Sequence, residues 1–139
     1  MIQRIQTLWL CLAAFAALLT LKFSFFSGNK VGDDLTKKWV ELTATNNFII
    51  LVLTVAIAVI SIIVIILYKD RKMQFRLTVI SFLLSIANII LYYTESKKFT
   101  EGNMDFTALI SIIVPVFLLF AARGIYKDDK LIKSADRLR

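Results

Sequence analysis

Five polar side chains within one apolar segment are the residues of this chain whose types and spacing most suggest chemistry. They follow one another at intervals of three or four positions: Thr78, Ser81, Ser85, Asn88 and Tyr92. In an α-helix this spacing places all five on one face. Such a stripe in a membrane helix either lines a path for a small ligand or forms a packing seam in which Asn88 bonds a neighbouring helix. Because no acidic or histidine side chain joins it, we expect the packing seam.

Small residues in the other apolar segments could pack against this stripe. Ala13 and Ala17 form one candidate contact, and Thr54, Ala58 and Ser61 share a face of the next apolar segment. The last apolar segment offers Ala108 and Ser111, followed by Pro115, which removes one backbone hydrogen bond and can kink a helix. Close helix packing in membranes favours small and hydroxylated residues of this kind.

Two clusters of charge are further candidates for binding. The loop 69–76 carries Lys69, Arg71, Lys72 and Arg76, which could contact anionic lipid headgroups at about 1 kcal/mol each. The simpler interpretation is that these four residues only set the orientation in the membrane. At the two ends of the chain, Arg4 could pair with Asp136, and together with Arg137 they could form a docking surface; solvated termini are the alternative.

The side chains that usually perform catalysis are scarce. The chain has no histidine and one cysteine, Cys11, and its acidic residues show no metal-ligand spacing. No glycine-rich phosphate loop is present. We therefore expect neither an enzyme nor a bound cofactor or metal ion.

Four apolar stretches must position all of these residues. They cover about 5–26, 48–68, 77–93 and 106–122, and each is long enough to cross a bilayer, which takes about 20 residues. Hydrophobic residues make up 58% of the 139, above the roughly 45–50% of soluble domains. The sequence predicts one domain, residues 1–139: an all-α membrane protein with four transmembrane helices in an antiparallel bundle.

The basic residues lie mostly on one side of these predicted spans. The ends of the chain and the loop 69–76 carry the whole formal net charge of +7, while the loops 27–45 and 94–105 together with Lys22 sum to zero. The positive-inside rule then places both termini in the cytoplasm, in agreement with an even number of spans. This distribution argues for a lipid bilayer rather than nucleic acid as the partner of the positive charge.

The sequence also allows expectations for the first span, for residues 39–43 and for the tail 123–139. The first span is expected to remain uncleaved, because its apolar run extends to Phe26. Residues 39–43 alternate apolar and polar side chains, so they predict a short strand or a segment lying on the membrane. The tail 123–139 predicts a short amphipathic helix that lies on the inner headgroups, docks on a partner or packs beneath the bundle. Its apolar face would comprise Ile125, Leu131, Ile132, Ala135 and Leu138.

The two ends of the chain also resemble a known family. The opening MIQRIQTL (residues 1–8) and the ending KDDKLIKSADRLR (residues 127–139), joined by four spans, resemble a family of uncharacterised four-span inner-membrane proteins from Bacteroidota, described as a domain of unknown function. The resemblance implies a multi-pass protein of the bacterial inner membrane with both termini cytoplasmic. It implies no activity.

These observations favour an accessory role over transport. A bundle of this size leaves no chain for a separate catalytic domain, so we expect a structural or accessory subunit of a larger membrane complex. The alternative is a small-solute or ion channel formed by several copies. The spans lack the acidic residues and broken helices that usually mark transport pathways.

Overall fold

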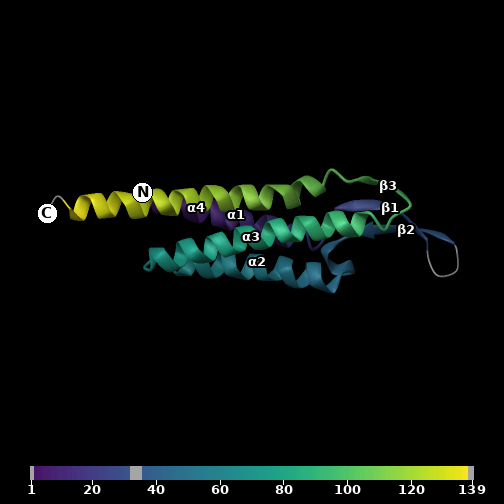
Figure 1. Ribbon diagram of the computed structural model, residues 1–139, viewed down its shortest axis with the longest axis horizontal. Coiled ribbons are helices and arrows are strands. Elements are labelled where there is room, and N and C mark those ends of the chain that lie inside the picture. The colour runs from purple at the N-terminus through teal and green to yellow at the C-terminus, as the bar shows by residue number, and fades with distance from the viewer. Residues whose placement is uncertain (1, 32–35, 138–139) are drawn as a thin grey trace.

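The computed structural model describes the backbone of residues 2–31 and 36–137 and the side chains of residues 5–30 and 36–137. Within these ranges the chain is mostly helical and includes a small sheet (Figure 1). The elements follow in the order α1 (Ile2–Leu19), β1 (Phe26–Val31), β2 (Lys37–Leu42), a 3-10 turn η1 (Ala44–Asn46), α2 (Phe48–Ile66), α3 (Arg71–Ser96), β3 (Glu101–Met104) and α4 (Ala108–Asp136).

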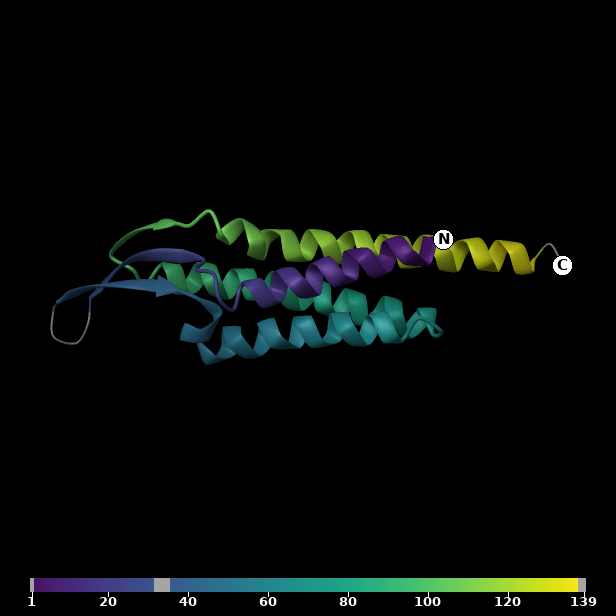
Figure 2. The same cartoon turned by 180° about the vertical axis from the view of Figure 1, so that it is seen from behind.

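The helices lie side by side along the long axis, and α1 and α3 each pack between α2 and α4. We call α1–α4 the helical body. The three strands lie at one end of it, which we call the sheet end (Figure 1). The start of α1, the turn between α2 and α3, and the end of α4 lie at the opposite end, the tail end (Figure 2).

Local sequence explains where α2 and α3 begin. The Asn47 side chain accepts a hydrogen bond from the Ile49 backbone amide at 3.0 Å, and Asp70 accepts one from Met73 at 3.2 Å. Both side chains thereby satisfy amides that a helix N-terminus leaves unpaired.

The 19 residues of α2 rise about 28 Å, close to the roughly 30 Å hydrocarbon thickness of a bilayer. Three helices, α2, α3 and α4, are long and apolar enough to cross a membrane.

The first predicted span is shorter than expected. Its helix was expected to reach Phe26, but α1 ends at Leu19, and Phe26 begins β1. The Thr20 hydroxyl donates to the Ala17 carbonyl at 2.7 Å, and a Phe–Ser alternation that suits a strand follows. Lys22 therefore lies exposed in the turn after α1 rather than inside a helix.

The all-α prediction was wrong at the sheet end. The strands form an antiparallel sheet in the order β2-β1-β3. A strand at 39–43 was one of the two expectations for that segment, and β2 covers most of it. No alternation in the short β3 segment EGNM indicated a strand, and its pairing with β1 joins distant parts of the chain.

The predicted tail is not a separate helix. The last helix, α4, runs without a break from Ala108 through Pro115 to Asp136. It therefore leaves the tail end along its own axis, and it extends beyond the other helices (Figures 1 and 2). An orientation along the membrane surface, one of the three sequence-based possibilities, does not fit a helix that continues straight from the apolar segment.

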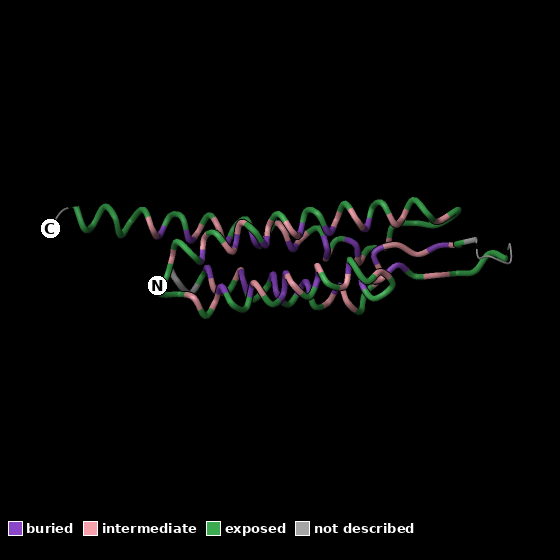
Figure 3. Tube along the Cα trace, turned by 60° about the horizontal axis from the view of Figure 1, so that its bottom comes forward, coloured by how far each residue is buried: buried purple, intermediate pink, exposed green. Residues whose placement is uncertain are grey.

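Buried and exposed residues alternate along each helix (Figure 3), and α3 differs from the other helices in which residues it buries. Large apolar side chains such as Ile49, Leu83 and Leu109 cover the outside of the helices, each about 60% exposed. The buried face of α3, in contrast, consists of six residues with polar groups: Gln74, Thr78, Ser81, Ser85, Asn88 and Tyr92. Such an arrangement on α3 is compatible with a helix whose outer surface meets hydrocarbon.

Candidate functional site

The polar stripe on α3 points into the helical body. Gln74 extends the five predicted residues by one turn, and we call these six residues the polar seam. Ala17, Thr54 and Ser111 of the neighbouring helices, and Thr20 in the turn after α1, line one small cavity with Ser85 and Asn88 of the seam. Ala108 belongs to the same buried cluster as Tyr92. Ala13, Ala58 and Ser61 are also buried, and their contact with the seam stays a prediction.

Most hydroxyl groups of the seam and its surroundings bond to the backbone of their own helix. Thr54 donates to the Ile50 carbonyl at 2.7 Å and Ser61 to Ile57 at 2.8 Å. Thr78 donates to Gln74 at 2.8 Å. A hydroxyl that donates to the carbonyl four residues earlier in its own helix has no proton left to donate to a neighbouring helix. These residues therefore let helices approach closely and offer few groups to a solute.

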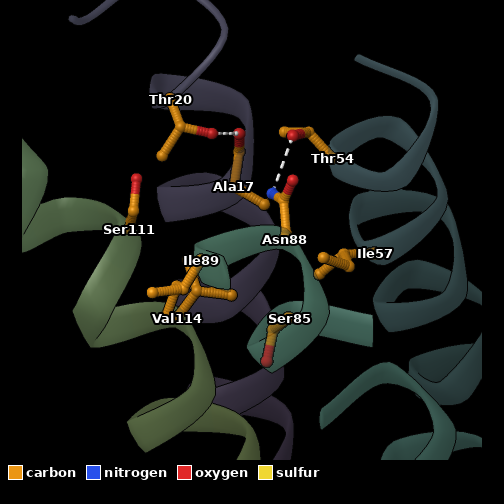
Figure 4. Close-up of a pocket in the computed structure, with 9 residues that line it drawn as sticks. All are labelled: Ala17, Thr20, Thr54, Ile57, Ser85, Asn88, Ile89, Ser111 and Val114. Carbon is orange, nitrogen blue, oxygen red and sulfur yellow. Dashed lines mark hydrogen bonds between the residues drawn. The ribbon is translucent and has the colours of Figure 1, made fainter. Parts of the chain in front are cut away.

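Asn88 is the exception, because its amide group links two helices. Its Nδ2 donates to the Thr54 hydroxyl at 3.0 Å, joining α3 to α2. Its Oδ1 is buried and has no hydrogen-bond partner among the described residues. Asn88 lines a small cavity, about 10 Å³ in volume, where residues of all four helices meet (Figure 4). This volume is about that needed by one water molecule.

Tyr92 connects the polar seam to the sheet end. Its ring stacks on Phe25 with centroids 4.7 Å apart. Its hydroxyl lies near those of Thr20 and Thr54, without the geometry of a formed hydrogen bond. Phe25, Leu42, Ala44 and Ile50 complete a second apolar cluster around it. The seam is therefore closed toward the strands by an aromatic stack.

The sheet end is held mainly by backbone contacts. Gly28 of β1 pairs with Gly102 of β3, and a Cβ on Gly28 would lie 2.3 Å from the Glu101 carbonyl oxygen. Asp105 accepts hydrogen bonds from Ser24 at 2.5 Å and Ser27 at 2.6 Å, which ties the entry of α4 to the exit of α1. On the outer surface, Lys37 bonds Glu101 at 3.0 Å and lowers the pKa of that carboxyl group.

At the tail end the seam meets a buried acid that the sequence interpretation missed. Asp128 of α4 is 6% exposed and accepts a hydrogen bond from Gln6 of α1. Nearby, Gln74 donates to the Val64 carbonyl at 3.2 Å. Both glutamines and Asp128 line a second cavity, about 20 Å³ in volume, with Arg71 at its side. The sequence did contain a signal for this acid: Ala121, Ile125 and Asp128 are spaced by four and three residues, which places Asp128 on the same inward face of α4 as the two apolar residues.

The four basic residues of loop 69–76 separate into two groups. Lys69 lies over the Tyr68 ring, 6.0 Å from its centroid. Arg71, Lys72 and Arg76 line a groove, about 210 Å³ in volume, between the start of α3 and α4. We call it the tail groove; its other walls are Phe75, Ile125, Tyr126 and Asp129.

The expected docking surface at the chain ends is described only in part. Asp136 is the last residue of α4 and Arg137 follows it, and both are exposed. The Arg4 side chain lies outside the described residues, so a pair between Arg4 and Asp136 stays a prediction.

Among the described residues, no group of three His, Cys, Asp or Glu side chains could hold a metal ion.

Comparison with known proteins identifies a family. A family model described as a domain of unknown function (DUF4293) matches residues 2–138, and the chain therefore belongs to that family. Neither a curated protein nor a solved structure matches the chain.

Proposed function

We propose that this member of the DUF4293 family is an integral membrane protein that serves as a non-catalytic accessory subunit of a larger assembly in the bacterial inner membrane. Three helices are long and apolar enough to span. We place α1 across the bilayer as well, since it packs along α4 and α2. Its Trp9 contacts Phe117 and Phe120 of α4, with ring centroids 5.6 and 5.2 Å apart.

The distribution of charge supports an orientation with the tail end in the cytoplasm. Arg71, Lys72 and Arg76 lie at this end, together with the basic residues of the α4 extension, whereas the connecting segments at the sheet end, with Lys22, carry no net charge. Positive charge near the ends of spans sets orientation in this direction. The sheet would then face the periplasm.

The filled interior supports an accessory role over transport through a single copy. The two interior cavities measure about 10 and 20 Å³, so each has room for about one water molecule. Ser81 Oγ, Asn88 Oδ1 and the Tyr92 hydroxyl are buried without a hydrogen-bond partner among the described residues, so free polar groups are present. A solute path would also need space, which cavities of this size do not supply.

The observation that carries the proposal is the exposed end of α4. The inward face of this helix passes through Leu118, Ala121, Ile125 and Asp128, all buried. By helical spacing the same face continues to Ile132 and Ala135, where the residues are exposed. We call Leu131, Ile132 and Ala135 the tail strip; Leu131 is 48% and Ile132 42% exposed.

The chemistry of this extension indicates the kind of partner. By helical spacing, Lys127 lies beside the tail strip, whereas Lys130 and Arg137 lie on the opposite face, and Asp129 is paired with Lys133 at 2.5 Å. A suitable partner is a membrane protein whose cytoplasmic surface presents an apolar strip with an acidic side chain beside it, opposite Lys127.

Purification in mild detergent from native membranes tests the proposal. We expect the tagged chain to elute with one membrane protein at a fixed ratio. The variant Leu131→Ser with Ile132→Ser should lose that partner, because the apolar contact is removed. A control variant, Lys130→Gln with Arg137→Gln, changes the opposite face and should keep it. Recovery of the unaltered chain only as a monomer or self-oligomer would contradict an accessory role.

A further inference from the structure

The tail groove combines three unpaired cations with apolar walls. Arg71, Lys72 and Arg76 form no ion pair with any described residue. Loop cations that serve only to orient the chain need no shared cavity, yet these three line one of about 210 Å³. The fourth cation of the loop, Lys69, lies apart over Tyr68.

The acid in the groove does not cancel this charge. Asp129 contributes to one wall, but its carboxylate bonds Lys133 at 2.5 Å, one turn further along α4. The pair is neutral as a unit. The buried Asp128 lines the neighbouring cavity together with Arg71 but forms no ion pair with it, so the net charge of the groove and this acid together remains positive. Guanidinium groups bind phosphate oxygens with two parallel hydrogen bonds, and two of the three cations are arginines.

The remaining walls suit the part of a lipid just below its headgroup. The rings of Phe75 and Tyr126 meet across α3 and α4 with centroids 6.0 Å apart, and Ile125 lies buried beside them. Leu77, the next residue after Arg76, begins the apolar part of α3. The groove thus lies where charged and apolar surfaces meet, which is the depth of lipid headgroups.

We propose that the tail groove binds the phosphate group of an anionic phospholipid, with Arg71, Lys72 and Arg76 holding the phosphate and with Phe75, Ile125 and Tyr126 contacting the glycerol and upper acyl chain. This inference rests on the membrane placement given under the proposed function, but not on the accessory role. Tight retention of such a lipid would fix the α3–α4 contact at the tail end.

Native mass spectrometry of the full chain, released from nanodiscs, tests the assignment. The nanodiscs contain phosphatidylcholine with a minor fraction of phosphatidylglycerol. We expect the chain to retain phosphatidylglycerol in preference to phosphatidylcholine. The variant R71Q/K72Q/R76Q should retain about tenfold less of it, since each cation near the headgroup contributes to binding.

A matched variant separates the groove from general charge attraction. K127Q/K130Q/R137Q removes the same charge from the α4 extension and should change retention less than about twofold. Equal loss in both variants, or no loss in the groove variant, would overturn the proposal. Tyr126→Ala leaves every cation in place and should also weaken retention, which general attraction does not predict.

Two further measurements distinguish a lipid site from a site for free phosphate and test the membrane placement separately. Millimolar inorganic phosphate should leave lipid retention unchanged; displacement by free phosphate would show a site for a soluble ion and overturn the lipid assignment. Extraction of the chain from membranes by carbonate without detergent would refute the membrane placement itself. Circular dichroism of each variant in detergent should match that of the unaltered chain, which shows that a lost lipid does not reflect a lost fold.

Discussion

The two ends of the helical body are built differently. At the sheet end, backbone hydrogen bonds between β2, β1 and β3 hold the connecting segments, and the Phe25–Tyr92 stack closes the interior. At the tail end, side-chain hydrogen bonds connect the helices: Gln6 of α1 bonds Asp128 of α4, and Gln74 of α3 bonds a carbonyl of α2. The sheet end is closed, while the tail end keeps a groove and an exposed helix.

This difference indicates where the molecule meets its partners. Edge strands need covering or charge to avoid pairing with other chains, and lysines supply charge on the edge strand β2. Apolar side chains such as Trp39 and Phe106 are exposed at the sheet end as well, but at the tail end α4 extends beyond the other helices and leaves an apolar helix face uncovered. An end closed by backbone contacts stabilises the fold, and an end held by side chains leaves surfaces for binding.

The largest expected effect comes from breaking the sheet end. Gly28→Val places a side chain where its Cβ would lie 2.3 Å from a β3 carbonyl oxygen, so β1 and β3 must separate. We expect the free energy of unfolding to fall by about 3 kcal/mol, measured by titration from mild detergent into dodecyl sulfate. Asn103→Val, on an exposed position of β3, is the control and should change it little. Equal loss in both variants would argue against a close contact of the two glycines.

The tail end should respond next. Gln6→Leu leaves the buried Asp128 carboxylate without its donor, at a cost of about 2 kcal/mol in the same assay. The double variant with Asp128→Leu should regain most of that loss, because both polar groups are then removed. Additive losses in the two single variants would mean that the two side chains do not interact.

The seam between the two ends should matter less. Asn88→Leu removes the hydrogen bond to Thr54 and should cost about 0.6 kcal/mol, the average for such bonds between membrane helices. Combined with Thr54→Val, the change should be less than the sum of the single losses. A loss of several kcal/mol would instead point to a polar network that holds the whole interior together.

The smallest effect belongs to the exposed pair at the sheet end. Lys37 lowers the pKa of Glu101 in the folded chain. The contribution to stability is therefore present above the ordinary glutamate pKa and is lost as pH falls through the lower, folded value. Glu101→Gln should lower the melting temperature slightly at pH 7, and its difference from the unaltered chain should shrink as the pH falls from about 5 to 3. A large change at pH 7 would give this pair a role that its exposure does not support.

The interior was more accessible to sequence reasoning than the ends. The spacing from Thr78 to Tyr92 predicted one shared face, and all five residues are buried, because a helix in hydrocarbon must turn its polar side inward. The ends depend on contacts between distant residues. The β1–β3 pairing joins Gly28 to Gly102 and the Gln6–Asp128 bond joins α1 to α4, so neither follows from local pattern.

The α4 extension illustrates the same limit. Its apolar residues were expected on one face, with Ile125 and Leu131 treated alike. In the structure Ile125 is buried and Leu131 is 48% exposed, because α4 extends beyond the other helices at this end. Periodicity gives the direction of a side chain but not whether a neighbour covers it.

Photo-crosslinking in living cells tests most directly the claim that the tail end carries the partner contact. A benzophenone side chain is placed at Ile132 in the tail strip and, in a separate variant, at the exposed Trp39 of β2. We predict one adduct of defined mass with another membrane protein from position 132 and none from position 39. Adducts from position 39 alone, or only a dimer of this chain from position 132, would contradict the account.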